Sequence, residues 1–304
     1  MLNNIYDYEP RSFGEIVCNV VSSNQDAIFY AKTSKGLFIK GDTRWLIFLS
    51  NESFRGPLTI NLTQNLELFN LLNRDDRLQI RSNKLFLPKL NQRILLGDQK
   101  RLWVTPKICT PFPNGLISLG QLKTNGIDKV FDENIRQDSY FIYLPILLKW
   151  RHNLDLYDYQ QMIYEDILIL INSIKNTKDK AIKVISNFLG KGRGLTPSGD
   201  DFIIGFLLML NRWGKTVNDT IDYDLINQRS VEEAYRKTTT LSANLIECAA
   251  NGMADERLIS ISDKLMIGNY SGNNFLKELY TYGSTSGMDS FIGMISGMLV
   301  LYGK

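Results

Sequence analysis

The sequence predicts an α+β protein, in which an N-terminal antiparallel, barrel-like β domain precedes a mainly α-helical C-terminal domain. Short segments rich in β-branched and aromatic residues, separated by turn formers, fill the first third of the chain. From Leu156 onward, apolar residues recur with the period of about 3.6 residues that is typical of helices. The transition contains several prolines and glycines, and we place the domains at 1–130 and 131–304.

The N-terminal domain is expected to be built from short strands. Their regular spacing favours an antiparallel sheet or a small barrel over alternating βαβ units. Strands are expected at residues 15–21, 27–32, 37–39, 45–49, 58–60, 84–87, 93–96 and 102–105, with one helix over 61–72.

The C-terminal domain is expected to contain at least six helices. Ser230-Val-Glu-Glu233 has the form of a capping box, and it predicts the start of a long helix that ends near Asn251-Gly252. The other helices are expected at 156–174, 181–189, 201–213, 272–280 and 289–302.

Composition excludes several classes of protein. With 44% hydrophobic and 22% charged residues, the chain is not mainly disordered, and a net charge of +3 argues against a nucleic-acid binder. The three cysteines form no CxxC pair, and the single histidine makes common zinc sites improbable, so no metal site is assigned. No export signal or run of about 20 apolar residues occurs. We therefore expect a cytoplasmic protein without a membrane partner.

Basic residues outnumber acidic ones between Arg74 and Lys107. Such a surface could steer an anionic substrate or receive an acidic partner. Lysine and arginine also protect the exposed edges of many sheets, which is the other interpretation of this segment.

The segment Gly190-Lys-Gly-Arg-Gly-Leu-Thr-Pro-Ser-Gly-Asp-Asp-Phe202 is the most informative stretch of the chain. Gly192 and Gly194 permit positive φ angles, and Thr196 is held extended before Pro197. Ser198 is expected to cap the following helix, with Asp201 bonding back to it. Such a turn into a helix N-terminus, through Gly199, presents free amides that suit an anion. The spacing matches neither the Rossmann fingerprint nor the Walker A loop.

The pattern S-G-x-D-x-x-I-G occurs twice, at Ser198–Gly205 and at Ser286–Gly293. In the second copy, Ser286, Gly287 and Asp289 occupy the positions of Ser198, Gly199 and Asp201. If the two helices pack as a pair, their N-termini converge on one pocket. The alternative is two unrelated capped helices whose glycines serve packing.

Polar residues at helical spacing follow Ser230. Thr240, Asn244, Glu247 and Asn251 form one stripe, and Thr239 and Ser242 border it. The stripe is either the wall of a pocket or an ordinary solvent-facing surface.

The aspartates conflict with an anion site, because each carboxylate repels a dianion by about 1–4 kcal/mol. Asp201 turned away as a cap would leave Asp200 and Asp289 to accept hydrogen bonds from an NH₂ group of the ligand. A Mg²⁺ bridging the carboxylates and a phosphate is a second arrangement. The third is that no anion binds.

Three motifs resemble an AllH-like bacterial family, associated with the third subunit of oxamate carbamoyltransferase in allantoin-derived nitrogen catabolism. They are Gly192–Phe202, Thr239–Ala243 and Ser284–Asp289. The resemblance implies transfer of a carbamoyl group between phosphate and the amide nitrogen of oxamate, within an assembly of partner subunits. The ligand is then a small anionic metabolite, carbamoyl phosphate or an oxamate-like molecule.

The resemblance suggests roles for the candidate residues. Asp200, Asp289 or Asn244 would orient an amide group during catalysis. The ligand would be bound by Gly192, Gly194, Thr196, Ser198, Gly199, Asp201, Ser242, Ser286 and Gly287. Two other classes of function remain open: a Mg²⁺-dependent hydrolase that uses paired aspartates, and a non-catalytic subunit that binds small anions or acts as a scaffold.

Overall fold

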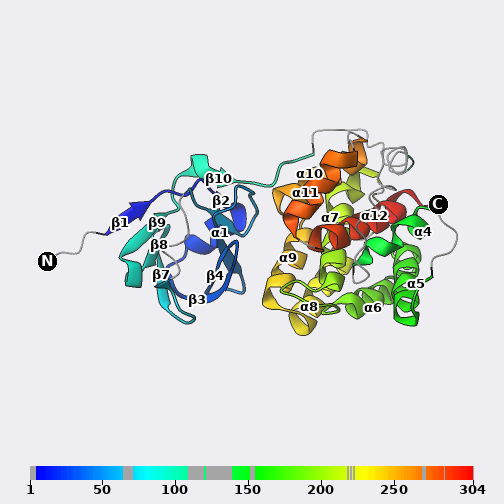
Figure 1. Ribbon diagram of the computed structural model, residues 1–304, viewed down its shortest axis with the longest axis horizontal. Coiled ribbons are helices and arrows are strands. Elements are labelled where there is room, and N and C mark those ends of the chain that lie inside the picture. Colours follow the sequence, from blue (N-terminus) through cyan, green and yellow to red (C-terminus); the bar gives the residue numbers. More distant parts are fainter. Residues whose placement is uncertain are drawn as a thin grey trace. The chain divides into compact units, whose positions relative to one another are not determined.

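The chain folds into two compact units, Met1–Pro106 and Lys107–Lys304, in a computed structural model (Figure 1). It describes residues 5–63, 71–108, 120, 139–150, 155–217, 219, 221, 223–268, 272–283 and 285–303, without the side chains of 272–276. The expected domain boundary between residues 130 and 131 lies outside the described residues.

The first unit is a curled, mixed β-sheet, which confirms the expected β-rich, barrel-like N-terminal part. Its strands follow the order β1-β9-β8-β7-β3-β4-β5-β6-β2-β10. The pairs β1–β9, β5–β6 and β2–β10 are parallel, so the sheet is not purely antiparallel as expected. The strands are β1 Tyr6–Tyr8, β2 Ser12–Gly14, β3 Gln25–Thr33, β4 Gly36–Gly41, β5 Leu46–Ser50, β6 Thr59–Asn61, β7 Arg77–Arg81, β8 Lys84–Leu87, β9 Gln92–Leu95 and β10 Leu102–Trp103.

The strand expected at 15–21 is wrong, because Glu15–Val21 forms helix α1. Its β-branched residues suggested a strand, but Ile16, Val17, Val20 and Val21 are all buried, at the spacing of one helical face. Most of the helix expected at 61–72 lies outside the described residues, and Asn61 itself ends β6.

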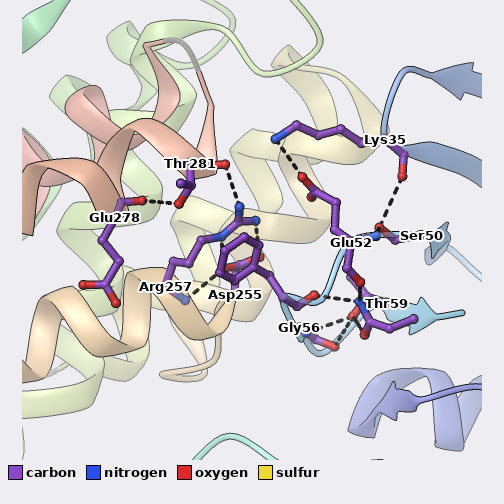
Figure 2. Close-up of polar contacts among 11 residues, drawn as sticks. Lys35, Ser50, Glu52, Gly56, Thr59, Asp255, Arg257, Glu278 and Thr281 are labelled. Atoms are coloured by element: carbon purple, nitrogen blue, oxygen red, sulfur yellow. Dashed lines mark hydrogen bonds and ion pairs between the residues drawn. The ribbon is translucent and has the colours of Figure 1, made fainter. Parts of the chain in front are cut away.

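A hydrogen-bonded loop connects β5 to β6 (Figure 2). The Ser50 hydroxyl donates to the Lys35 carbonyl oxygen and accepts from the Glu52 amide, while the Glu52 carboxylate lies 3.3 Å from the Lys35 ammonium group. The Thr59 hydroxyl accepts from the Gly56 amide and donates to the Gly56 carbonyl oxygen. Hydrogen bonds within and next to the loop thus pair several of its polar groups, in the connection between the parallel strands β5 and β6.

The second unit is helical, as expected. Its helices are the 3₁₀ helix η4 Tyr140–Tyr143 and the α-helices α4 Leu144–Leu147, α5 Asp158–Ser173, α6 Lys178–Phe188, α7 Ser198–Val217, α8 Tyr223–Lys237, α9 Thr240–Ala250, α10 Glu256–Ile267, α11 Gly272–Tyr282 and α12 Ser286–Tyr302. No helix among these described residues is long and apolar enough to cross a membrane.

The long helix expected to begin at Ser230 is wrong. Ser230 lies buried in the middle of α8. The helix ends at Lys237, and a new helix, α9, begins where the Thr239 hydroxyl accepts a hydrogen bond from the Ser242 amide. Helix α10 was not predicted, although Asp255 caps its start and Gly268, in the left-handed region at φ 81°, ends it.

Helices α7 and α12 lie side by side at the centre of this unit, and nearly every residue of their first three turns is buried (Figure 1). Glycines bring the two backbones into direct contact. A Cβ on Gly205 would lie 1.8 Å from the Ser290 carbonyl oxygen, and one on Gly293 would lie 2.0 Å from that of Phe202. These contacts are reciprocal, because each joins the eighth residue of one S-G-x-D copy to the fifth residue of the other.

We expect Gly205→Ala and Gly293→Ala each to lower the free energy of unfolding by about 3 kcal/mol, because a backbone carbonyl cannot move aside for the added methyl group. Urea denaturation measures the loss. Gly97→Ala is the control, since its Cβ would meet nothing closer than 3.9 Å. Similar stability of all three variants would contradict the close contact of α7 and α12.

Candidate functional site

The starts of α7 and α12, which carry the two Ser-Gly pairs, lie next to each other. The hydroxyl oxygens of Thr196, just before α7, and of Ser286, the first residue of α12, lie 3.3 Å apart. Together with the reciprocal glycine contacts farther along, this means that α7 and α12 begin at the same end and run in the same direction. We call Thr196, Asp201, Ser286 and Gly287 the α7–α12 opening.

Asp201 is the buried centre of the opening. Its side chain is 1% exposed, and its Oδ2 accepts a hydrogen bond of 3.2 Å from the Thr196 hydroxyl. Its Oδ1 is buried without a hydrogen-bond partner among the described residues. Burial raises the pKa of Asp201 well above its ordinary value, and the carboxyl groups of Asp289 and Asp200 raise it further, against the hydroxyls of Ser286 and Thr196.

Neither serine caps its helix as expected. Helix α7 begins at Ser198 itself, so the position before it is Pro197, which has no side-chain acceptor. Helix α12 is preceded by Thr285, whose side chain forms no capping hydrogen bond. Ser198 is half-buried at the start of α7, whereas Ser286 faces Thr196.

Asp200 and Asp289 hold the surrounding chain in place. Asp200 Oδ1 accepts from the Gly190 amide at 2.7 Å, and its Oδ2 accepts from the Thr238 hydroxyl between α8 and α9. Asp289 Oδ1 accepts from the Ser139 hydroxyl at 2.8 Å and from the Tyr140 amide at 2.6 Å, at the start of η4. Both aspartates are fully buried and therefore tie distant segments to the helix starts.

The glycine loop before α7 folds back on the helix. Gly192 and Gly194 have φ angles of 122° and 99°, and a Cβ on Gly192 would lie 2.6 Å from the Ser198 amide nitrogen. The amide of Gly199 donates to the Lys191 carbonyl oxygen and that of Asp200 to the Pro197 carbonyl oxygen. The expectation of free amides at α7 is therefore wrong for these two residues.

The start of α12 differs from that of α7 in the hydrogen bonds of its first amides. Its Asp289 amide donates to the Thr285 carbonyl oxygen, as in any helix. The amides of Ser286, Gly287 and Met288 form no hydrogen bond with the described residues outside the helix, and such first-turn amides have no acceptor within it. These first-turn amides of α12 are thus candidates for bonds to a ligand, although Gly287 and Met288 are buried.

The polar stripe of α9 forms a separate network. The Asn244 amide nitrogen donates to the Tyr235 hydroxyl at 2.8 Å, and that hydroxyl donates to Glu247 at 2.8 Å. Ser242 is fully buried, with no hydrogen-bond partner for its hydroxyl among the described residues, while Asn251 is exposed. The stripe is therefore not a solvent face throughout. At its start, the Thr239 hydroxyl donates to the Leu195 carbonyl oxygen in the loop before α7 at 3.1 Å.

Several residues that contact the cluster could not be predicted from any local pattern. Ser139, Tyr140 and Thr238 are 38 to 150 positions away from the aspartates that they contact. Tyr282 is the last residue of α11. Burial raises the pKa of its hydroxyl, and the nearby charge of Asp201 raises that pKa further. Only the adjacent Thr238-Thr239-Thr240 run was a visible signal.

Behind Tyr282 lies a buried arginine. The Arg257 guanidinium stands 5.2 Å from the Tyr282 ring centre, bonds Asp255 through two nitrogens at 2.8 Å, and donates to the Thr281 carbonyl oxygen at 2.6 Å (Figure 2). Its charge is thus balanced by Asp255. This arrangement holds the end of α11 to the start of α10.

The remaining expectations concern cations. Among the described residues, no group of three or more His, Cys, Asp or Glu side chains could hold a metal ion. In the basic segment, Arg81, Lys89, Arg93 and Arg101 are paired with Asp26, Asp76, Asp7 and Glu9. These pairs favour the interpretation of that segment as a charged sheet surface.

The buried Asp201 predicts how stability depends on pH. A carboxyl group whose pKa is raised on folding stabilises the fold fully below the unfolded pKa of about 3.9, and this contribution is lost as the pH rises toward the folded pKa. We expect the free energy of unfolding to fall above about pH 4, by up to about 1.4 kcal/mol per pH unit.

Asparagine stays neutral at every pH, so in Asp201→Asn the free energy of unfolding should fall less as the pH rises above about 4. Denaturation at a series of pH values measures it, with the exposed Asp224→Asn in the first turn of α8 as control. Identical pH profiles of Asp201→Asn and the unmodified chain would contradict a protonated Asp201.

Comparisons with known proteins agree with the motif resemblance. The family model of oxamate carbamoyltransferase subunit AllH matches residues 188–298, which include both Ser-Gly openings. Searches of curated proteins and of solved structures gave no match. The chain is thus similar to this family over the segment that contains α7, α9 and the start of α12.

Proposed function

We propose that this chain is a cytoplasmic subunit of an oxamate carbamoyltransferase, and that it binds a small anionic metabolite at the α7–α12 opening. The AllH family implies a subunit of that enzyme. The observation that carries the ligand proposal is the 3.3 Å approach of the Thr196 and Ser286 hydroxyls, which come from the two copies of one motif. The metabolite is carbamoyl phosphate or an oxamate-like molecule.

Hydrogen-bond donors of several kinds converge at the opening. Thr196 and Ser286 are both half-buried residues, so part of each is exposed to solvent and to a ligand. The first-turn amides of α12 add further donors and the positive end of the helix dipole. Asp200 and Asp201 accept hydrogen bonds from the Gly190 amide and from the hydroxyls of Thr238 and Thr196. The donors identified at the opening are thus neutral hydroxyls and amides, at the positive end of the helix dipole.

These donors suit carbamoyl transfer. In that reaction the amide nitrogen of the acceptor attacks the carbamoyl carbon, a C–N bond forms, the C–O bond to phosphate breaks, and the nitrogen loses a proton to the solvent or phosphate. Fixed donors stabilise an oxygen that gains negative charge, and a held acceptor spends less entropy in reaching the carbon. We assign Thr196, Ser286 and Gly287 to binding, and Asp200 and Asp289 to positioning the chain around the opening.

The alternatives have less support. A Mg²⁺-dependent hydrolase needs a carboxylate group arranged around a metal, and the described residues contain no such arrangement. A non-catalytic anion-binding or scaffold subunit would use the same opening, so geometry does not distinguish it from an enzyme component. Assay of oxalurate formation by the full chain, alone and with its partner subunits, separates the two.

We expect Ser286→Ala and Thr196→Val each to weaken ligand binding about tenfold, because each removes a hydroxyl donor worth about 1–1.5 kcal/mol. Isothermal titration calorimetry with carbamoyl phosphate and with oxamate measures the affinity. Ser296→Ala, which removes a buried hydroxyl bonded to the Ile292 carbonyl oxygen farther along α12, is the control. Unmodified affinity in both opening variants, or no binding of either compound, would contradict the proposed function.

A further inference from the structure

Asp201 stands among polar groups that come from several elements. Thr196 lies on the loop before α7, Asp200 in the same helical turn, Ser286 and Asp289 on α12, and Tyr282 on α11, with Asp255 and Arg257 behind it. Three of these groups are carboxyls, and the one arginine is bonded to Asp255 through two nitrogens. Asp201 is therefore surrounded by negative and neutral groups.

The three aspartates at the helix starts, Asp200, Asp201 and Asp289, differ in the hydrogen bonds that their carboxyl oxygens accept. Both oxygens of Asp200 accept hydrogen bonds from the chain, and Asp289 Oδ1 accepts two. Asp201 Oδ2 accepts from Thr196, whereas its Oδ1 is buried without a partner in the described part of the chain. The Ser242 and Ser290 hydroxyls are also buried without a partner in that part of the chain. Asp201 Oδ1 is the one of these three atoms that belongs to a carboxyl group at the opening, and a buried polar oxygen without a partner points to a group that binds there.

The protonation state decides what that oxygen can do. Burial and the nearby carboxyls favour the neutral acid, as the raised pKa of Asp201 indicates. A neutral carboxyl group carries an O–H donor, and because Oδ2 already accepts from Thr196, the proton belongs on Oδ1. A buried carboxylic acid of this kind can donate to a ligand oxygen.

We propose that Asp201 donates a hydrogen bond, as a neutral acid, to a carboxylate or carbonyl oxygen of a small carboxamide, so that the α7–α12 opening holds the carboxamide acceptor and not the phosphorylated donor. This inference rests on the proposed function and names the substrate class of its site. A phosphate dianion carries twice the charge of a monoanion and is repelled more strongly by the carboxyl groups of Asp200 and Asp289. A carboxamide carries at most one negative charge and offers planar oxygens to the donors.

The test is isothermal titration calorimetry of the full chain with oxamate and with sulfate between about pH 5 and pH 9. Both probes keep a constant charge over that range, so a change in affinity reports the protein. We expect oxamate to bind at least about tenfold more tightly than sulfate. We also expect its affinity to fall as the pH rises through the titration of Asp201, with proton uptake on binding, because ionised Asp201 loses its donor and repels the ligand.

Variants test the residue itself. Asp201→Asn keeps a donor without a titratable proton, so oxamate affinity should stay within about threefold of its low-pH value and lose its pH dependence. Asp201→Ala should weaken binding at least about tenfold, and Asp224→Asn should change nothing. The comparison of oxamate with sulfate uses the unmodified chain and so does not depend on how the variants fold.

Two kinds of result would overturn the inference. Sulfate binding as tight as that of oxamate, or oxamate affinity that rises with pH, would show that Asp201 does not donate, while the opening would still bind an anion as proposed. Binding of neither probe would remove this inference together with the proposed function.

Discussion

The contact between the backbones of α7 and α12 is the constraint on which the helical unit depends. Gly205 and Gly293 leave no room for a side chain, and each lies against a carbonyl oxygen of the other helix. Helices at this distance cannot slide or rotate without a clash, so their first turns are fixed relative to each other. The positions of Thr196, Asp201 and Ser286 follow from that fixed register.

The same packing creates the electrostatic character of the opening. Bringing equivalent turns together also brings Asp201 and Asp289 together, in a region where water is largely excluded. Asp200 and Asp289 are compensated by amide and hydroxyl donors from η4, the glycine loop and the α8–α9 junction. Among the described residues, the Thr196 and Ser286 hydroxyls are the groups that lower the pKa of Asp201, and protonation is the least costly way to bury it. Because a protonated Asp201 is neutral and has an O–H donor, this acidic cluster can bind a ligand that carries oxygen acceptors.

The repeated S-G-x-D-x-x-I-G pattern indicated two arrangements, a pair of helices that begin side by side or two unrelated capped helices, and the glycine contacts decide for the pair. It was not enough to predict what the aspartates bind. The partners of Asp289 are 149 and 150 positions away, and no local pattern connects them. Helix α1 was mistaken for a strand since Ile16, Val17, Val20 and Val21 have high β propensity, and packing overrode that preference. The break between α8 and α9 has no glycine or proline to mark it.

A crystal structure of the full chain with oxamate bound tests the central claim most directly. The account predicts a ligand oxygen within hydrogen-bonding distance of the Asp201 carboxyl group and of the Thr196 or Ser286 hydroxyl, with the starts of α7 and α12 adjacent. Oxamate bound elsewhere on the chain, or α7 and α12 beginning at opposite ends of the helical unit, would contradict it.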